Sequence, residues 1–195
     1  MALHYLSAEQ LLNDSQALAL QIVNSGFQPD LLVALWRGGA PIGLAIHEVF
    51  ALTSAGCEHL CIRAESYRGL NQQQVRFFGL ELLPPLLASS ARILLVDDVF
   101  DTGRTMQALI KHFALIAPGQ KLDLRIATPW YKPGKNQTAL VPDYHLHTTD
   151  DWLVFPHELQ DLSDAEILAK PGKPELLQQL VALRQLRPQT TEPNR

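Results

Sequence analysis

A run of aliphatic residues that ends in two adjacent carboxylates is the strongest chemical signal in the sequence. Residues 93–96 are Ile, Leu, Leu and Val, and Asp97 and Asp98 follow them directly. An unbroken apolar run predicts a strand buried on both faces, so the two acids would stand at the carboxyl end of that strand. Open α/β sheets bind their ligands at this end. Because unpaired charges are costly inside a protein core, the pair indicates a ligand-binding edge.

The residues after the acidic pair predict an anion site. Asp101, Thr102, Gly103 and Thr105 lie just before or at the start of a helix predicted over Thr105–Ile116. Backbone N–H groups, two hydroxyls and a helix N-terminus would meet there, an arrangement that binds phosphate. Adjacent carboxylates can accept hydrogen bonds from neighbouring sugar hydroxyls. Two adjacent acids alone are more often an N-cap and acidic turn, but the whole segment describes a cradle for a ribose 5-phosphate.

The elements expected around this loop alternate between strands and helices. A capping box at residues 7–10 opens the first helix, which Gly26 ends, and Pro41 lies in the first turn of the second, which extends to Leu52. This alternation predicts an α/β fold, with a mostly parallel sheet that carries helices on both faces. A long polar loop is expected over Glu65–Gln74, and helical periodicity returns near Ser163 and over 174–186. The predicted strands are Leu31–Trp36, Cys57–Ala64, Val75–Leu80, Ala91–Asp97 and Leu122–Thr128.

Length and composition fit one globular domain. The chain has 195 residues, of which 47% are hydrophobic and 18% are charged, and single domains usually have about 100–200 residues. We expect one domain over residues 1–186 with a small subdomain mainly from 129–160, and a polar, disordered tail over 187–195. Cys57 and Cys61 have no further cysteine to pair with, which excludes a disulfide framework and a thiolate zinc cage; both are expected to be buried.

The charge and hydropathy patterns argue against two classes of partner. A net charge of −4 gives no overall basic field for nucleic acid or a membrane surface. The longest apolar run has six residues, over 31–36, whereas a membrane helix needs about 20. The first ten residues lack the pattern of a secretory signal, so we expect a cytoplasmic protein.

The segment from Ile93 to Thr105 resembles the phosphoribosyl pyrophosphate motif of type I phosphoribosyltransferases, and the later loops resemble those of the 6-oxopurine enzymes. The resemblance implies a type I phosphoribosyltransferase fold and transfer of the 5-phosphoribosyl group to purine N9, with release of pyrophosphate. It makes Asp101 the candidate general base for the purine N7 proton. It implies Mg²⁺ as cofactor, near Asp97, Asp98 and Glu158. The residues expected to bind ribose and phosphate are Asp97, Asp98, Asp101, Thr102, Gly103, Arg104 and Thr105.

Two further loops have counterparts in that family. Trp36, Arg37 and Gly38 stand where relatives bind pyrophosphate, and in relatives this loop often carries a non-proline cis peptide, which we expect next to Arg37. An arginine beside glycines suits the site, because its guanidinium makes forked bonds to phosphate oxygens. Ser66 and Tyr67 open the polar loop and resemble the start of a mobile lid; an idle solvated loop is the alternative.

Base recognition is expected in the last third of the chain. By the resemblance, Lys132 would donate to the purine 6-oxo group, Trp152 would stack on the ring, and the main chain of Leu153 would lie near the 2-position. A buried ammonium favours a keto oxygen over an amino group. Val154 departs from the pattern, because xanthine-guanine enzymes have an acid two residues after the stacking tryptophan. Hypoxanthine is therefore favoured, with guanine or xanthine as alternatives.

Other functions fit the sequence less well than this one. Adenine and orotate are alternative bases, which the pairing of Lys132 with Trp152 disfavours. A non-catalytic regulator that senses phosphoribosyl pyrophosphate would need a basic face or a DNA-binding segment, and neither is evident. A zinc hydrolase built on His145, His147 and His157 lacks a matching acid or a third ligand at suitable spacing. The expected partners are small-molecule substrates and further copies of the chain, as a dimer or tetramer.

Overall fold

The computed structural model describes residues 3–53, 56–68, 73–87 and 91–185. They belong to two compact units, a larger one over Leu12–Asp150 and a smaller one from Met1–Leu11 and Asp151–Arg195. The segment 129–160, predicted to form one subdomain, is divided between the two units. The single domain over 1–186 stays a prediction, and the predicted tail over 187–195 lies outside the described residues. Each unit is described here by itself.

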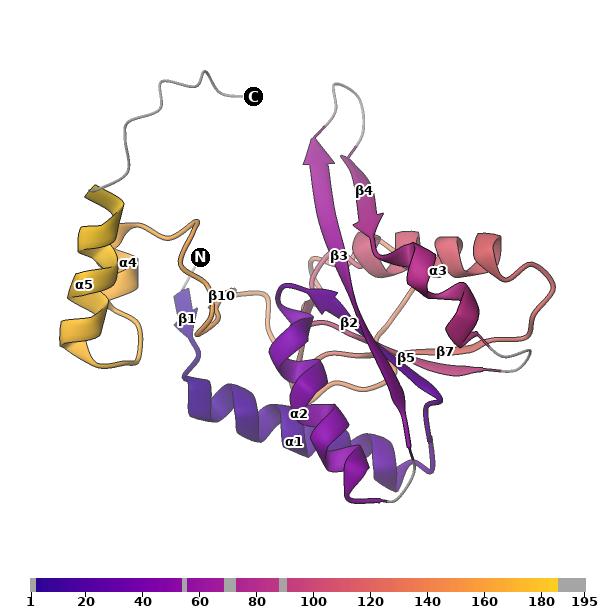
Figure 1. Cartoon of the computed structure of the whole chain (residues 1–195). Coiled ribbons are helices and arrows are strands. Elements are labelled where there is room, and N and C mark those ends of the chain that lie inside the picture. Colours follow the sequence, from indigo (N-terminus) through magenta and orange to yellow (C-terminus); the bar gives the residue numbers. More distant parts are fainter. Residues whose placement is uncertain (1–2, 54–55, 69–72, 88–90, 186–195) are drawn as a thin grey trace. The chain divides into compact units, whose positions relative to one another are not determined.

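A five-stranded sheet with the order β4-β3-β2-β5-β7 forms the centre of the larger unit (Figure 1). Strands β3, β2, β5 and β7 are parallel, and β4 is antiparallel to β3. This confirms the predicted α/β fold with a mostly parallel sheet. The strands are β2 (Leu31–Trp36), β3 (Glu58–Arg68), β4 (Gln73–Phe78), β5 (Arg92–Val96) and β7 (Asp123–Ala127).

The helices follow the predicted order. The structure shows one of the two hydrogen bonds of the predicted capping box at the start of α1: Ser7 Oγ accepts from Gln10 N at 3.0 Å. Helix α2 packs closely on β2, because a Cβ at Gly43 would lie 2.7 Å from the Cβ of Ala34. Helix α3 packs on the opposite face of the sheet, against the side chains that alternate with Ala34. The bounds are α1 (Ala8–Asn24), α2 (Gly39–Ala51) and α3 (Arg104–Ile116).

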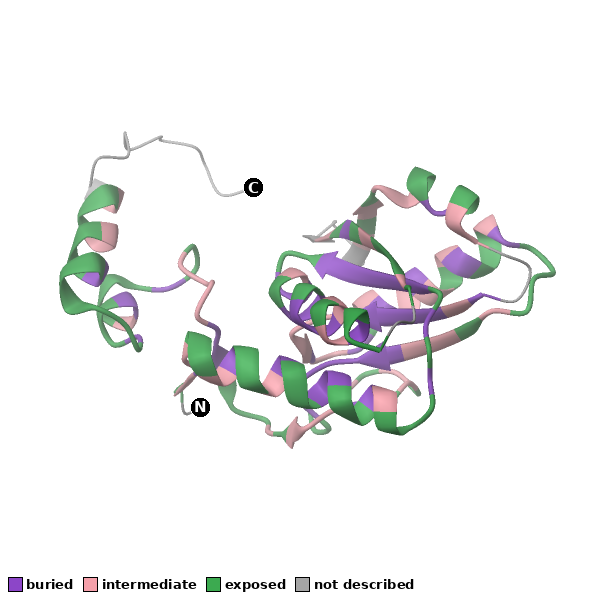
Figure 2. Ribbon diagram, turned by 60° about the horizontal axis from the view of Figure 1, so that its bottom comes forward, coloured by how far each residue is buried: buried purple, intermediate pink, exposed green. Residues whose placement is uncertain are grey.

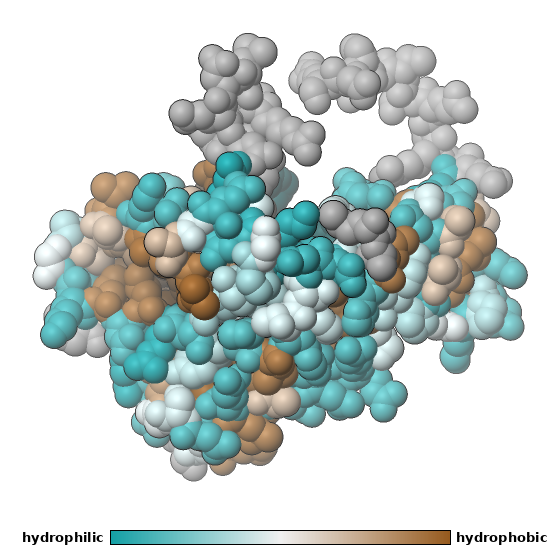
Figure 3. All heavy atoms as spheres, turned by 180° about the vertical axis from the view of Figure 1, so that it is seen from behind, coloured by the Kyte–Doolittle hydropathy of each residue, from teal (hydrophilic) through white to brown (hydrophobic). Residues whose placement is uncertain are grey.

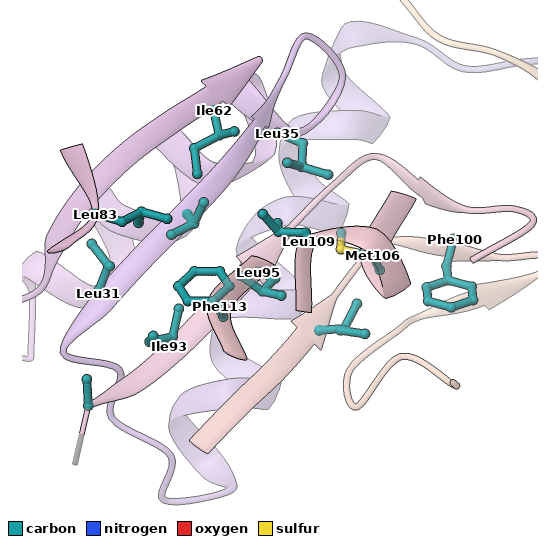
Figure 4. Packing of buried hydrophobic residues seen from close by; sticks show 13 residues of the cluster. Leu31, Leu35, Ile62, Leu83, Ile93, Leu95, Phe100, Met106, Leu109 and Phe113 are labelled. Atoms are coloured by element: carbon teal, nitrogen blue, oxygen red, sulfur yellow. The ribbon is translucent and has the colours of Figure 1, made fainter. Parts of the chain in front are cut away.

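The main core lies between the sheet and α3 (Figure 4). Leu109 and Phe113 of α3 meet alternate residues of the central strands, among them Val33 and Leu95, and all four are fully buried. Figure 2 shows the central strands as the most buried part of this unit. Burial of a large apolar side chain contributes about 1.5–3 kcal/mol, so this core gives the carboxyl ends of the strands a rigid base.

The predicted polar loop over Glu65–Gln74 is wrong in part. Strand β3 continues to Arg68 and β4 begins at Gln73, with Arg68 opposite Gln73 in an antiparallel ribbon. Polar residues can pair through their main chains without any hydrophobic alternation, which is why the ribbon was not visible in the sequence. Residues 69–72 lie outside the described part of the chain. The predicted end of the next strand at Leu80 moves to Phe78, followed by short 3₁₀ turns over Leu80–Leu82 and Pro84–Leu86.

A small sheet was missed in the sequence. It contains β6 (Val99–Phe100), β8 (Trp130–Tyr131) and β9 (His147–Thr148), all parallel. Strand β6 directly precedes Asp101, and β8 directly precedes Lys132. The small sheet therefore brings together two segments that carry predicted site residues.

The smaller unit is built on a parallel pair, β1 (Leu3–Tyr5) with β10 (Trp152–Val154). Its helices are α4 (Asp164–Leu168), which Ser163 and Glu166 begin as a capping box, and α5 (Pro174–Gln185). Strand β1 was not predicted. The apolar core of this unit includes Val154, Leu162, Ile167 and Leu177.

The surface carries a mixture of polar and apolar residues. In the view of Figure 3, hydrophobic residues form several separate groups among hydrophilic ones. Cys61 is exposed and Cys57 is only partly buried, so the expectation that both are buried was wrong; Cys61 faces the side of β3 opposite to the α3 core. Among the described residues, no helix combines the length and the hydropathy needed to cross a bilayer.

Candidate active site

The acidic pair lies at the carboxyl end of β5, as predicted. Asp97 N donates a hydrogen bond to Ala127 O of β7 at 3.3 Å, and Asp98 N donates to Asp97 Oδ1 at 3.0 Å. Burial, and after it the nearby charge of Asp98, raises the pKa of Asp97 well above its ordinary value of 3.8. A cation or hydroxyl donors beside these carboxylates would stabilise the ionised form of Asp97 and so oppose both causes of the raised pKa.

The loop over residues 36–39 packs directly against this strand end. A Cβ added to Gly38 would lie 2.0 Å from Asp98 Oδ2, and one added to Gly39 would lie 2.3 Å from Val96 O. Only glycine fits at such distances. The peptide bond between Trp36 and Arg37 is cis, which confirms the prediction made for this position. Trp36 and Arg37 are both exposed, and the next residue, Gly38, is the one that packs against Asp98.

The predicted phosphate loop connects β6 to α3. Gly103 stands at the N-cap of α3 with φ +75°, a left-handed conformation that favours glycine. The first N–H of the helix, that of Arg104, donates a hydrogen bond to Thr102 Oγ1 at 3.4 Å. An N-terminus of this kind presents N–H groups and a positive dipole end to an anion. A hollow of about 290 Å³ opens here, and its lining includes Asp97, Asp101, Thr102, Gly103 and Thr105. Arg104 is exposed in the first turn of the helix.

Lys132 and Asp101 are in contact. Lys132 is only 5% exposed, and its Nζ lies 3.4 Å from Asp101 Oδ2. The main chain supports this contact, since Lys132 N donates to Phe100 O at 2.9 Å. The structure thus brings together the residue predicted to recognise the 6-oxo group and the residue predicted to act as general base.

The other two residues predicted to contact the base lie in the smaller unit. Trp152 is 51% exposed, whereas Leu153 is buried. Val154 is fully buried in the core of that unit. Glu158 Oε2 accepts a hydrogen bond from Phe155 N at 3.1 Å, so this carboxylate holds a turn of its own segment. The roles of Trp152 and Leu153 in base binding, and of Glu158 near a metal, stay predictions.

The predicted lid residues fall at the end of β3. In the backbone register, Ser66 lies opposite Val75 and Tyr67 opposite Gln74. Their side chains are outside the described part of the structure. The lid therefore stays a prediction, and its first residues belong to a β-ribbon.

The histidines considered for a zinc site have structural contacts. His147 Nε2 lies 3.1 Å from Asp14 Oδ2, and its ring packs against the tilted ring of Trp130, with the two ring centroids 4.4 Å apart. His145 packs edge-on against Tyr131. Within the described residues, no three His, Cys, Asp or Glu side chains are grouped so that they could hold a metal ion.

Sequence reasoning missed residues that support the phosphate loop from outside. A Cβ at Gly103 would lie 2.6 Å from Thr138 Oγ1 and 2.8 Å from the Phe100 ring. Asn136, two residues before Thr138, makes side-chain hydrogen bonds at both of its polar atoms. The only signal in the sequence is that turn-forming residues are frequent after Lys132.

A family model and one relative each match most of the chain. The phosphoribosyl transferase domain family model matches residues 3–164. A xanthine-guanine phosphoribosyltransferase from Chromohalobacter salexigens is 30% identical over 156 residues, which cover 79% of this chain and 83% of that protein.

Solved structures with the same fold include two that cover most of the chain. A purine phosphoribosyltransferase from Pyrococcus horikoshii has a TM-score of 0.64 at 24% identity, covering 84% of this chain and 99% of that one. A hypothetical protein from Neisseria gonorrhoeae with bound ppGpp has a TM-score of 0.68 at 18% identity, covering 93% and 97%. At these identities the likeness shows the fold.

Proposed function

The chain belongs to the phosphoribosyl transferase domain family, and from this we propose that it is a purine salvage enzyme. It transfers the 5-phosphoribosyl group of phosphoribosyl pyrophosphate to N9 of a 6-oxopurine and releases pyrophosphate. The observation that carries the proposal is the contact of Lys132 with Asp101 beside the hollow at the start of α3. The lining of the hollow then offers an anion site and a carboxylate acceptor, and this carboxylate is in contact with a buried donor.

Different residues bind the 5′-phosphate, the ribose hydroxyls and the pyrophosphate of the substrate. The N–H groups at the start of α3 and the hydroxyls of Thr102 and Thr105 bind the 5′-phosphate. Asp97 and Asp98 accept hydrogen bonds from the ribose hydroxyls. Arg37, on the loop packed against Asp98, donates to pyrophosphate and offsets the negative charge that grows as the bond at C1 stretches.

Asp101 takes the proton from purine N7 as N9 attacks C1 of the sugar. A carboxylate suits this role when it is held within hydrogen-bonding reach of the base, and general base catalysis typically contributes about 10²–10⁴-fold. Lys132 donates to the 6-oxo group, where its charge stabilises electron density that moves toward the oxygen. The transition state should resemble an oxocarbenium ion, as in glycoside hydrolysis.

The acidic pair fits a divalent cation. Two neighbouring carboxylates, one with a pKa raised by burial and by the other's charge, form a site that a cation stabilises. Mg²⁺ usually takes one or two carboxylates together with substrate oxygens and several waters. We therefore propose that Asp97 and Asp98 hold Mg²⁺, which would neutralise charge on the departing pyrophosphate.

Hypoxanthine is the favoured base. A 6-amino group cannot accept a hydrogen bond from Lys132, which disfavours adenine. Where xanthine-guanine enzymes have an acid, this chain has Val154, and its side chain is fully buried in the core of the smaller unit. That position therefore offers no partner for a 2-amino group, so guanine gains little over hypoxanthine.

A side-by-side assay tests the proposal. Consumption of phosphoribosyl pyrophosphate is measured with hypoxanthine, guanine, xanthine, adenine and orotate, each with and without Mg²⁺. We expect the highest kcat/KM with hypoxanthine and no turnover in the presence of a chelator. Preference for adenine or orotate would refute the assignment of the base, and no turnover with any base would refute the proposed activity. A cytoplasmic location and a dimer or tetramer stay predictions.

A further inference from the structure

The segment after Lys132 contacts the chain on both sides of Asp101. Lys132 N donates to Phe100 O at 2.9 Å, and Gln137 N donates to Thr102 O at 3.0 Å. Phe100 and Thr102 are the neighbours of Asp101 in sequence. The segment over residues 132–140, here called the clasp, therefore fixes the main chain before and after this carboxylate.

One side chain holds the clasp in shape. Asn136 Nδ2 donates to Leu140 O at 2.7 Å and to Tyr131 OH at 3.2 Å. Asn136 Oδ1 accepts from Thr138 N at 2.9 Å and from Thr138 Oγ1 at 3.0 Å. An amide side chain offers two donors and two acceptor positions, so every hydrogen-bonding position of the Asn136 side chain is used. No other residue type has this combination at this size.

The clasp also reaches the phosphate loop. Thr138 Oγ1, which donates to Asn136, accepts a hydrogen bond from Leu140 N at 3.2 Å. The same oxygen would lie 2.6 Å from a Cβ on Gly103, at the start of α3. Asn136 thus fixes the side chain that packs against the residue at the helix N-terminus.

We propose that Asn136 is a positioning residue, which sets Lys132 and Asp101 in register with the phosphate loop. This inference rests on the proposed function. The covalent structure of the nucleotide product limits the distance from the 5′-phosphate to the purine N7 and 6-oxo groups. The enzyme must therefore hold its anion site and its base-binding pair at one matching separation. Asn136 connects the two through the clasp, without touching either substrate itself.

Steady-state kinetics of Asn136→Ala provide the first test. A misplacement of catalytic groups can lower the rate on the order of 10²-fold, and we expect kcat/KM for hypoxanthine to fall about 10- to 100-fold. The matched control is Gln137→Ala, because Gln137 is exposed and contributes to the clasp through its main chain. The kcat/KM of this control for hypoxanthine should stay within about twofold of the wild-type value.

A double-mutant cycle separates positioning from a general loss of stability. In an Asp101→Asn background, Asn136→Ala should lower kcat/KM by no more than about twofold. Its effect passes through the Lys132–Asp101 pair, which the Asp101→Asn variant has already lost. The shift in melting temperature, in contrast, should be the same in both backgrounds.

A milder pair of variants covers the case in which Asn136→Ala does not fold. Thr138→Ser keeps the hydroxyl that bonds Asn136 and should keep wild-type kcat/KM, whereas Thr138→Val should lower it about tenfold. The inference is overturned if Asn136→Ala and Thr138→Val both keep wild-type kcat/KM, or if Asn136→Ala and Asp101→Asn are fully additive. A wild-type enzyme without transfer to any base would instead refute the proposed function, before any variant is made.

Discussion

The Lys132 ammonium lies 3.4 Å from the Asp101 carboxylate, although the two residues are far apart in sequence. The lysine is buried, whereas the side chain of Asp101 is 42% exposed. A buried cation needs a counter-charge, and this carboxylate provides one. Asp101 also lines the hollow at the start of α3, so the carboxylate that neutralises the buried lysine is the one proposed to accept the purine proton.

Asp101→Asn should lower kcat on the order of 10²–10⁴-fold, because the amide cannot accept the purine proton. Binding of phosphoribosyl pyrophosphate should change little, since the helix N–H groups are retained. Steady-state kinetics and calorimetric titration measure the two effects separately. Asp123→Asn serves as control, because Asp123 begins β7 and so lies at the amino end of the strands, opposite to the carboxyl ends that carry the site. Unchanged turnover in Asp101→Asn would remove this residue from the mechanism.

Lys132→Met should weaken the preference for 6-oxopurines. A hydrogen bond to a charged group contributes about 1.5–3 kcal/mol, so kcat/KM for hypoxanthine should fall about 10- to 100-fold while that for adenine falls less. The measurement is the ratio of kcat/KM values for the two bases. Lys135→Met changes a lysine of the same segment and should leave the ratio as it is. A fall that is equal for both bases would contradict a role in recognising the 6-oxo group.

The strand and loop that carry Asp97, Asp98 and Asp101 could be predicted because local sequence determines both. An unbroken aliphatic run defines β5, and a glycine in the left-handed region ends the loop. The cis peptide before Arg37 could be predicted from the resemblance to a family. Each of these features depends on residues that are adjacent in the chain.

The remaining features depend on pairing across the fold. Strands β6, β8 and β9 have two residues each, which is too short for a hydrophobic pattern. Strand β1 pairs with β10, whose residues lie far along the sequence. The hydrogen bonds of Asn136 close a loop whose shape no periodicity encodes. Tertiary pairing decides such elements, and a single sequence does not reveal it.

Gly39→Ala should destabilise the protein. The added Cβ would lie 2.3 Å from Val96 O, so the main chain of β5 or of the loop must shift. Overpacking of this kind typically costs about 1–3 kcal/mol, and the shift would also disturb the acidic pair. Gly56→Ala is the matched control, because nothing lies within 4 Å of its Cβ position. Urea unfolding of both variants checks this, and equal stabilities would show that the loop is not held against β5.

Asp97 should make the protein less stable as pH rises. Burial and the charge of Asp98 raise the pKa of Asp97 above its ordinary value of 3.8, so the folded state keeps a proton that the unfolded state has lost. The contribution of Asp97 to stability is complete when the pH is below its ordinary pKa, and it is lost as the pH rises through the raised pKa of the folded state. Asp97→Asn should therefore increase the free energy of unfolding at neutral pH and weaken phosphoribosyl pyrophosphate binding. Urea unfolding over a pH series, without added Mg²⁺, measures the first effect.

Asp30 provides the control of opposite sign. A hydrogen bond from Arg92 lowers the pKa of Asp30 below its ordinary value, so its contribution is present above that value and is lost as pH falls. Asp30→Asn should then be less stable than the wild type at neutral pH, and the difference should shrink in acid. If Asp97→Asn behaves in the same way as Asp30→Asn, the acidic pair is stabilised in its charged form by groups of the protein itself. The need for a cation or sugar hydroxyls at that edge would then lose its physical basis.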